Sequence, residues 1–126
     1  MIVLDAWALL AYLRNESASA RVEQGWDSNG AAMCSVNLGE ALYAEIRTSG
    51  RGAAEAAITA ARRQMTLVDP DWELVSAAAE IKARGGLSYA DAFCVATAQQ
   101  LGAPLWTGDP ELVALSDEVE IVDLRS

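Results

Sequence analysis

The sequence predicts an α/β fold: a three-layer sandwich with a mostly parallel central sheet flanked by helices. Short apolar, branched runs alternate with helical patterns along the chain. Strands that alternate with helices imply right-handed crossovers and a sheet covered on both faces. With 126 residues, the chain is long enough to bury a core of its own. We therefore expect a single domain spanning residues 1–126.

Five short segments are predicted to form the strands. Each is rich in apolar residues, which is typical of parallel strands that are buried on both faces. They cover residues 2–5, 31–35, 65–69, 103–107 and 119–124.

Helices are predicted between these strands. Leu9, Leu10 and Leu13 recur at helical spacing in the first of them, and Gly85–Gly86 separates two later ones. The expected helices cover residues 6–14, 17–27, 37–49, 52–63, 71–84, the stretch 87–102, and 109–115.

Composition excludes several kinds of chemistry. The chain has no histidine, which rules out Ser-His-Asp and Cys-His catalysis, and two cysteines alone cannot complete a structural zinc site. Cys34 and Cys94 lie in apolar runs and are expected to be buried, reduced thiols. Lys82 is the only lysine. The remaining groups for catalysis are carboxylates, hydroxyls and arginines.

Charge and hydropathy set further limits. A net charge of −9 argues against a general nucleic-acid binder, because phosphates are contacted by Lys and Arg. It does not exclude a nuclease whose acids gather in a metal site. No segment approaches the roughly 20 apolar residues of a spanning helix, and the opening MIVLD lacks the basic start of a signal peptide. A cytoplasmic protein without membrane contact is expected.

Four acids are predicted to meet at one edge of the sheet. Asp5 ends the first strand, Glu40 lies early in the helix after the second, and Asp109 follows the fourth. Asp91 lies early in the helix that leads back to the start of the fourth strand. If strands one, two and four are neighbours, all four acids lie at the carboxyl edge, where such sheets bind ligands.

Helix capping is the alternative explanation for these acids. The segment SYAD is a capping box with Ser88 as the cap, and NLGE repeats the pattern with Asn37 as the cap. Asp109 before proline is a good cap, and Asp5 is suited to capping its own helix.

Capping explains Asp91 less well, because it shares a helical face with Cys94, Val95 and Ala98. A carboxylate in a core needs a partner, and no Lys or Arg lies within six residues of it. Two carboxylates about 6 Å apart repel by roughly 3 kcal/mol at an effective dielectric near 20. Mg²⁺ or Mn²⁺, which prefer oxygen ligands, would relieve this repulsion.

Four segments resemble, in order and spacing, the acidic motifs of the PIN domain, and most closely those of VapC-type toxin ribonucleases. They are VLDAWALLAYL, SVNLGEALYAE, LSYADAFCVATA and LWTGDPEL, and together the likeness covers essentially the whole chain. The resemblance implies a PIN-like fold. It makes Asp5, Glu40, Asp91 and Asp109 the catalytic, metal-binding acids, with Thr107 as a hydroxyl that supports the pocket.

The resemblance also implies an activity and partners. VapC-type toxins are endoribonucleases that depend on Mg²⁺, with Mn²⁺ as a substitute, and leave a 5′-phosphate and a 3′-hydroxyl. One or two such ions would polarise the phosphate and activate a water. The implied partners are an RNA substrate, a cognate antitoxin protein and a second copy of the chain in a homodimer. The apolar LLAYL segment and Trp26 would suit a partner helix, although the same residues also suit an ordinary core.

The chain departs from the family pattern at two tryptophans. Trp7 stands where family members often carry a small hydroxyl residue, which removes a hydrogen bond and narrows the pocket, and Trp106 replaces a smaller aliphatic residue. Both are interpreted as core residues. Arg84 and Arg14 are candidates for contacting RNA at the rim, with solvated helix ends as the alternative.

Two other functions compete with the ribonuclease. A catalytically inactive PIN-like binding module is compatible with Trp7, although all four acids are present. A phosphotransfer domain needs an acid ending the third strand, which Asp69 would supply, and a lysine ending the last strand, which is missing.

Overall fold

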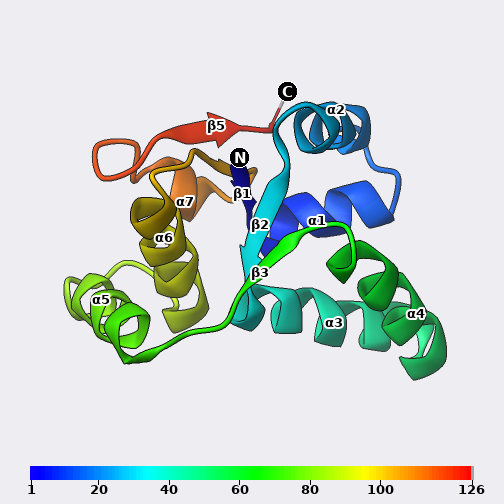
Figure 1. Ribbon diagram of the computed structural model, residues 1–126, viewed down its shortest axis with the longest axis horizontal. Helices are drawn as coiled ribbons and strands as arrows, with labels where there is room; N and C mark the ends of the chain where they lie inside the picture. The colour runs from blue at the N-terminus through cyan, green and yellow to red at the C-terminus, as the bar shows by residue number, and fades with distance from the viewer. Residues whose placement is uncertain (126) are drawn as a thin grey trace.

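The computed structural model describes residues 1–125, and its five strands form one sheet in the order β3-β2-β1-β4-β5 (Figure 1). All neighbouring strands are parallel, which confirms the predicted parallel sheet. Strand β1 lies between β2 and β4, the arrangement that the predicted meeting of the acids requires. The strands are β1 (Ile2–Leu4), β2 (Ala31–Cys34), β3 (Thr66–Val68), β4 (Leu105–Thr107) and β5 (Ile121–Asp123).

Helices connect these strands at close to the predicted positions. Most helix boundaries differ from the prediction by one or two residues. One helix begins at Ser35, two residues early, and another runs to Asn29, where Gly30 at φ 76° ends it. The helices in residues 1–125 are α1 (Ala6–Leu13), α2 (Ser19–Asn29), α3 (Ser35–Ser49), α4 (Arg51–Arg62), α5 (Trp72–Ala83), α6 (Tyr89–Leu101) and α7 (Pro110–Val113).

The sheet separates two helical layers. In Figure 1, α5, α6 and α7 lie on one side of the strands, and α1 to α4 lie on the other. The core is divided in the same way, because side chains alternate along each strand. Val3 and Leu105 pack with the α5–α7 layer, whereas Leu4 and Met33 pack with the α1–α4 layer.

Both cysteines are buried free thiols, as the sequence predicted. Trp106 and Trp7, both interpreted as core residues, differ in their burial. Trp106 is partly buried against the core on the α1–α4 side, where Gly25 makes room for its ring. Trp7 is 37% exposed, so its interpretation as a core residue is wrong. Among residues 1–125, no helix is both long enough and apolar enough to cross a bilayer.

Candidate active site

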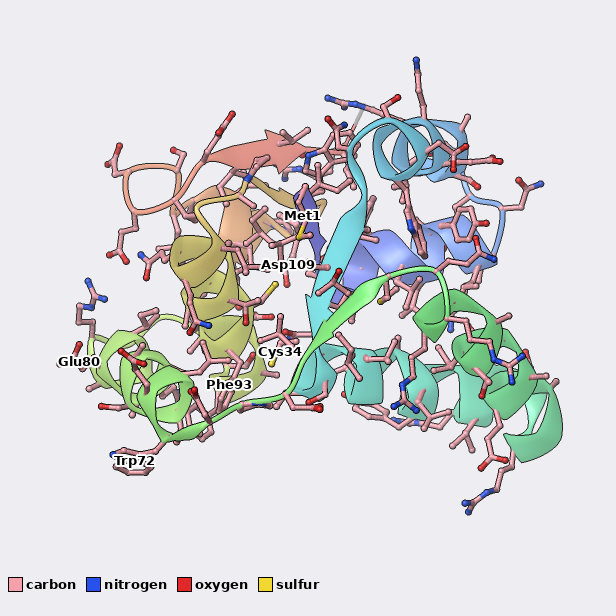
Figure 2. The ribbon with its side chains drawn as sticks, viewed as in Figure 1. Met1, Cys34, Trp72, Glu80, Phe93 and Asp109 are labelled. Carbon is pink, nitrogen blue, oxygen red and sulfur yellow. The ribbon has the colours of Figure 1, made fainter. Side chains whose placement is uncertain are left out.

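The four candidate acids belong to elements that meet at the carboxyl edge of β2, β1 and β4. Asp5 directly follows β1, and Asp109 comes two residues after β4. Glu40 lies in α3, which starts where β2 ends, and Asp91 lies in the first turn of α6. Figure 2 shows Asp109 near the centre of the molecule, close in this view to Cys34, the last residue of β2.

Asp5 is held by two hydrogen bonds and is only 4% exposed. Its Oδ1 accepts the N–H of Ala8 at 2.8 Å, which caps α1, and its Oδ2 accepts the hydroxyl of Thr107. The pKa of this carboxyl is raised from 3.8 to about 7, mainly by burial; the charges of Asp91 and Asp109 also raise it, and the two hydrogen bonds lower it. Asp5 is therefore a helix cap and also a destabilised anion.

Thr107 joins Asp5 to the segment that carries Asp109. Its fully buried hydroxyl donates to Asp5 and accepts the backbone N–H of Asp109 at 2.9 Å. Asp109 Oδ1 in turn accepts the N–H of Glu111 at 2.9 Å, so the predicted cap of α7 is confirmed. The Thr107 hydroxyl fixes the orientation of the Asp5 carboxylate relative to the loop after β4.

Asp91 lies in the first turn of α6, and the residues that directly follow it in this helix are apolar and buried. The predicted cap by Ser88 is confirmed, because its Oγ accepts the N–H of Asp91 at 3.1 Å. Burial raises the pKa of the Asp91 carboxyl from 3.8 to about 6, followed by repulsion from Asp109 and Glu40. The neighbouring carboxylates are thus close enough to disfavour the charge of Asp91.

Asn37 does not cap a helix, contrary to the prediction. Helix α3 already begins at Ser35, so Asn37 lies inside its first turn and Glu40 in the turn after it. The Asn37 side chain is 1% exposed, and its Nδ2 donates to Glu40 Oε1 at 3.0 Å and to the carbonyl of Ala90 at 2.9 Å. Its Oδ1 is buried and has no hydrogen-bond partner among residues 1–125. Asn37 therefore fixes the Glu40 carboxylate and ties α3 to the start of α6, next to Asp91.

The arginines proposed for the rim are already paired with acids elsewhere. Arg14 Nε lies 2.7 Å from Glu45 Oε1, and Arg84 Nη1 lies 3.2 Å from Glu118 Oε1. Arg14 and Arg84 are the C-cap residues of α1 and α5, so both lie at helix ends, and a contact of either arginine with RNA stays a prediction. Within the part of the chain that the structure describes, no ion pair involves any of the four candidate acids.

The donor chemistry of this edge suits a hard divalent cation. Carboxylate oxygens are the ligands that Mg²⁺ and Mn²⁺ prefer, and a cation would relieve the mutual repulsion that raises the pKa of Asp91. Across residues 1–125, no three acidic, cysteine or histidine side chains are arranged so that they enclose a metal ion directly. Mg²⁺ commonly retains several waters and takes only one or two carboxylates directly. The residues present therefore fit a hydrated ion at an open site.

The fold and site define a class of protein. In the strand order β3-β2-β1-β4-β5 the direction of winding reverses between β1 and β4, which is a topological switch point where open α/β sheets bind ligands. Asp5 and Asp109 follow these two strands. The family model of the PIN domain matches residues 2–118, so the chain belongs to the PIN domain family.

Several solved structures are similar in fold. Mycobacterium tuberculosis VapC20, a sarcin–ricin loop cleaving toxin, has a TM-score of 0.76 at 21% identity, covering 91% of this chain and 95% of its own. A toxin–antitoxin complex from Klebsiella pneumoniae has a TM-score of 0.79 at 13% identity, covering 100% and 99%. VapBC2 from Rickettsia felis, bound to a promoter DNA fragment, has a TM-score of 0.79 at 12% identity, covering 98% of each chain. The comparison with curated protein sequences gave no match.

Proposed function

We propose that this chain is a divalent-metal-dependent endoribonuclease and the toxin component of a toxin–antitoxin pair. One observation carries the proposal: acids from four separate elements gather at the switch point, and two of them have pKa values raised by burial and by neighbouring acids. Membership of the PIN domain family and the similarity to VapC20, which cleaves RNA at the sarcin–ricin loop, support the same activity.

The proposed metal-binding residues are Asp5, Glu40, Asp91 and Asp109, with Mg²⁺ as the ion and Mn²⁺ as a substitute. A bound divalent ion supplies charge to polarise the scissile phosphate and lowers the pKa of a coordinated water. The protein keeps the carboxylates in place. The hydroxyl of Thr107 and the N–H of Ala8 fix both oxygens of Asp5, and the amide of Asn37 fixes Glu40.

The proposed antitoxin partner is supported by an apolar hollow outside the acidic edge. It lies between α1, α2 and α4 and is lined mainly by Tyr12, Leu13, Trp26, Ala57 and Ala61. The LLAYL segment and Trp26 contribute to this hollow, and the same residues also pack against the core. Similar folds occur in toxin–antitoxin complexes. We further expect the chain to form a homodimer.

The test uses partner-free protein with total cellular RNA and Mg²⁺ or Mn²⁺. Wild type is compared with Asp91→Asn, with Asp71→Asn as a matched substitution of an exposed acid outside the site, and with wild type in EDTA. We expect cleavage by wild type and Asp71→Asn, and none by Asp91→Asn or in EDTA. RNA ends are then mapped for a 5′-phosphate.

Calorimetric titration with Mn²⁺ separates the alternatives. Metal binding without cleavage of any RNA would support the inactive PIN-like binding module. Neither binding nor cleavage would leave the acids as helix caps, and the proposed function would be wrong.

A further inference from the structure

Trp7 is linked to two of the proposed metal-binding acids, to one through the chain and to the other through a contact with the residue beside it. It is in the first turn of α1, two residues after Asp5, and its ring lies against Gly108, which directly precedes Asp109. The large aromatic side chains that are exposed in residues 1–125 are Trp7, Tyr43, Trp72 and Tyr89. Of these, Trp7 is the one that touches the loop between β4 and Asp109 while following Asp5 in the chain.

The contact with Gly108 fixes the orientation of the Trp7 ring. A Cβ built on Gly108 would lie 2.4 Å from Cζ2, 2.5 Å from Cη2 and 2.6 Å from Cε2 of Trp7. Near-equal distances to three successive ring atoms mean that the glycine approaches the face of the indole and not its edge. Any side chain at position 108 would displace the ring. Trp7 is nevertheless 37% exposed, so part of a residue whose ring orientation is fixed by Gly108 remains accessible to a ligand.

The negative charge of the protein favours an RNA contact that does not depend on positive side chains. Protein contacts to RNA phosphates come mainly from Lys and Arg, but the net charge is −9 and the two arginines nearest in sequence to Asp5 and Asp91, Arg14 and Arg84, are paired with glutamates. Base stacking on an aromatic side chain supplies affinity without positive charge and tolerates different bases. It requires a base that is not already stacked within a duplex.

We propose that Trp7 is the stacking platform for an unpaired nucleobase next to the scissile phosphate, and so selects single-stranded or looped RNA. This inference rests on the proposed ribonuclease function and adds a residue to its substrate site. Trp7 positions RNA and takes no part in bond cleavage. Its closeness in the chain to Asp5 and its contact with Gly108 put the stacked nucleotide beside the phosphate at the acids.

Binding is measured in the Asp91→Asn background, so that the RNA stays intact. The probes are a fluorescent single-stranded RNA oligonucleotide of mixed sequence and the same strand in a perfect duplex, titrated in Mg²⁺ and followed by anisotropy. Trp7→Ala is expected to weaken single-strand binding about 10-fold, with Trp7→Phe in between. Duplex binding is expected to stay unchanged.

Trp72→Ala is the matched control. Trp72 is 79% exposed, and Figure 2 shows it at the outer edge of α5, away from Asp109. Its removal is expected to leave binding unchanged. Trp7→Leu fills apolar volume but cannot stack, so it tests the inference even if Trp7→Ala fails to fold. Single-strand binding by Trp7→Leu equal to that of the parent would overturn the inference.

Cleavage kinetics in the wild-type background distinguish this inference from the function on which it rests. Trp7→Ala is expected to raise KM for single-stranded RNA more than it lowers kcat. Wild-type cleavage with unchanged KM in Trp7→Ala overturns the stacking role and leaves the ribonuclease intact. Trp7-dependent binding without wild-type cleavage supports the stacking role and overturns the ribonuclease.

Discussion

Two aspartates in this protein begin helices in the same way but sit in opposite surroundings. Asp5 and Asp71 both have φ −89° and ψ 178°, and both accept the N–H three residues ahead, at 2.8 Å and 2.9 Å. Asp71 is exposed, whereas Asp5 is 4% exposed, accepts a second hydrogen bond from Thr107 and is repelled by Asp91 and Asp109. Capping therefore describes both residues, and only burial among other acids sets Asp5 apart.

The comparison shows why capping and catalysis are not competing explanations. A cap satisfies one carboxylate oxygen through a local backbone contact that any aspartate before a helix makes. At Asp5 this contact also fixes the direction of a carboxylate that long-range packing has buried. The same local motif thus positions the proposed metal ligand.

The largest expected effect is on stability against pH in EDTA. The pKa of Asp5 is raised from 3.8 to about 7, so the folded state binds the proton more tightly and is stabilised at low pH. That stabilisation is complete below about pH 4 and is lost as pH rises through about 7. At about 1.4 kcal/mol per pKa unit, Asp5 alone should contribute a loss of at most about 3 kcal/mol to the free energy of unfolding between about pH 5 and pH 8, measured by denaturant unfolding.

Substitutions show which carboxyl group causes this loss of stability as the pH rises. The chain has no histidine, so carboxyls dominate titration in this window, and Asp91, with a pKa of about 6, acts in the same direction. Asp5→Asn is expected to reduce the dependence of stability on pH to the part that Asp91 contributes. Asp71→Asn is expected to leave this dependence unchanged. Added Mg²⁺ is expected to restore stability at the higher pH, because it binds the folded state. If the free energy of unfolding of the wild type did not change with pH in EDTA, the raised pKa of Asp5 would be contradicted.

The next largest effect is on cleavage. Asp5→Asn is expected to lower metal-dependent RNA cleavage by at least about 100-fold, equivalent to about 2.7 kcal/mol, because metal sites tolerate few changes even in supporting residues. Asp71→Asn keeps a cap of the same geometry and is expected to stay within about twofold of wild type. Rates are measured on one RNA substrate at saturating Mg²⁺. Equal losses in both variants would mean that capping, and not metal binding, explains Asp5.

Much of the fold was predictable from the sequence because the strands are short apolar runs separated by strong helix signals. The caps by Asp5, Ser88 and Asp109 were predicted from local motifs and are confirmed. The sheet order was not fixed by local signals. The meeting of the acids was predicted only on the condition that strands one, two and four are neighbours, and β1 does lie between β2 and β4. The metal-binding role of these acids stays a prediction.

The failures share one physical cause: they depend on contacts between distant segments. Asn37 matched a capping pattern, yet α3 starts earlier and its amide reaches Ala90, 53 residues away. A polar residue on the apolar face shared with Leu38 and Ala41 was the available signal. Trp7 was interpreted as core but is 37% exposed, and its ring contacts Gly108, which follows a strand about 100 residues later. The pairing of Arg14 with Glu45 likewise joins two distant segments, the end of α1 and helix α3, which are 31 residues apart in the chain.

The smallest expected effect is the difference in stability cost between removing Asp71 and removing Asp5. Asp71→Ala removes only a cap, so denaturant unfolding should show a loss of about 1 kcal/mol in the free energy of unfolding at any pH where the carboxylate is charged. Asp5→Ala removes a cap and also a buried charge. In EDTA its cost should therefore be larger at about pH 5, where Asp5 is neutral and its hydrogen bonds are lost without compensation, than at about pH 8, where an unfavourable anion disappears as well. An equal cost of Asp5→Ala at both pH values would mean that the pKa of Asp5 is not raised in the folded state, and that neither burial nor the acids around Asp5 destabilise its charge.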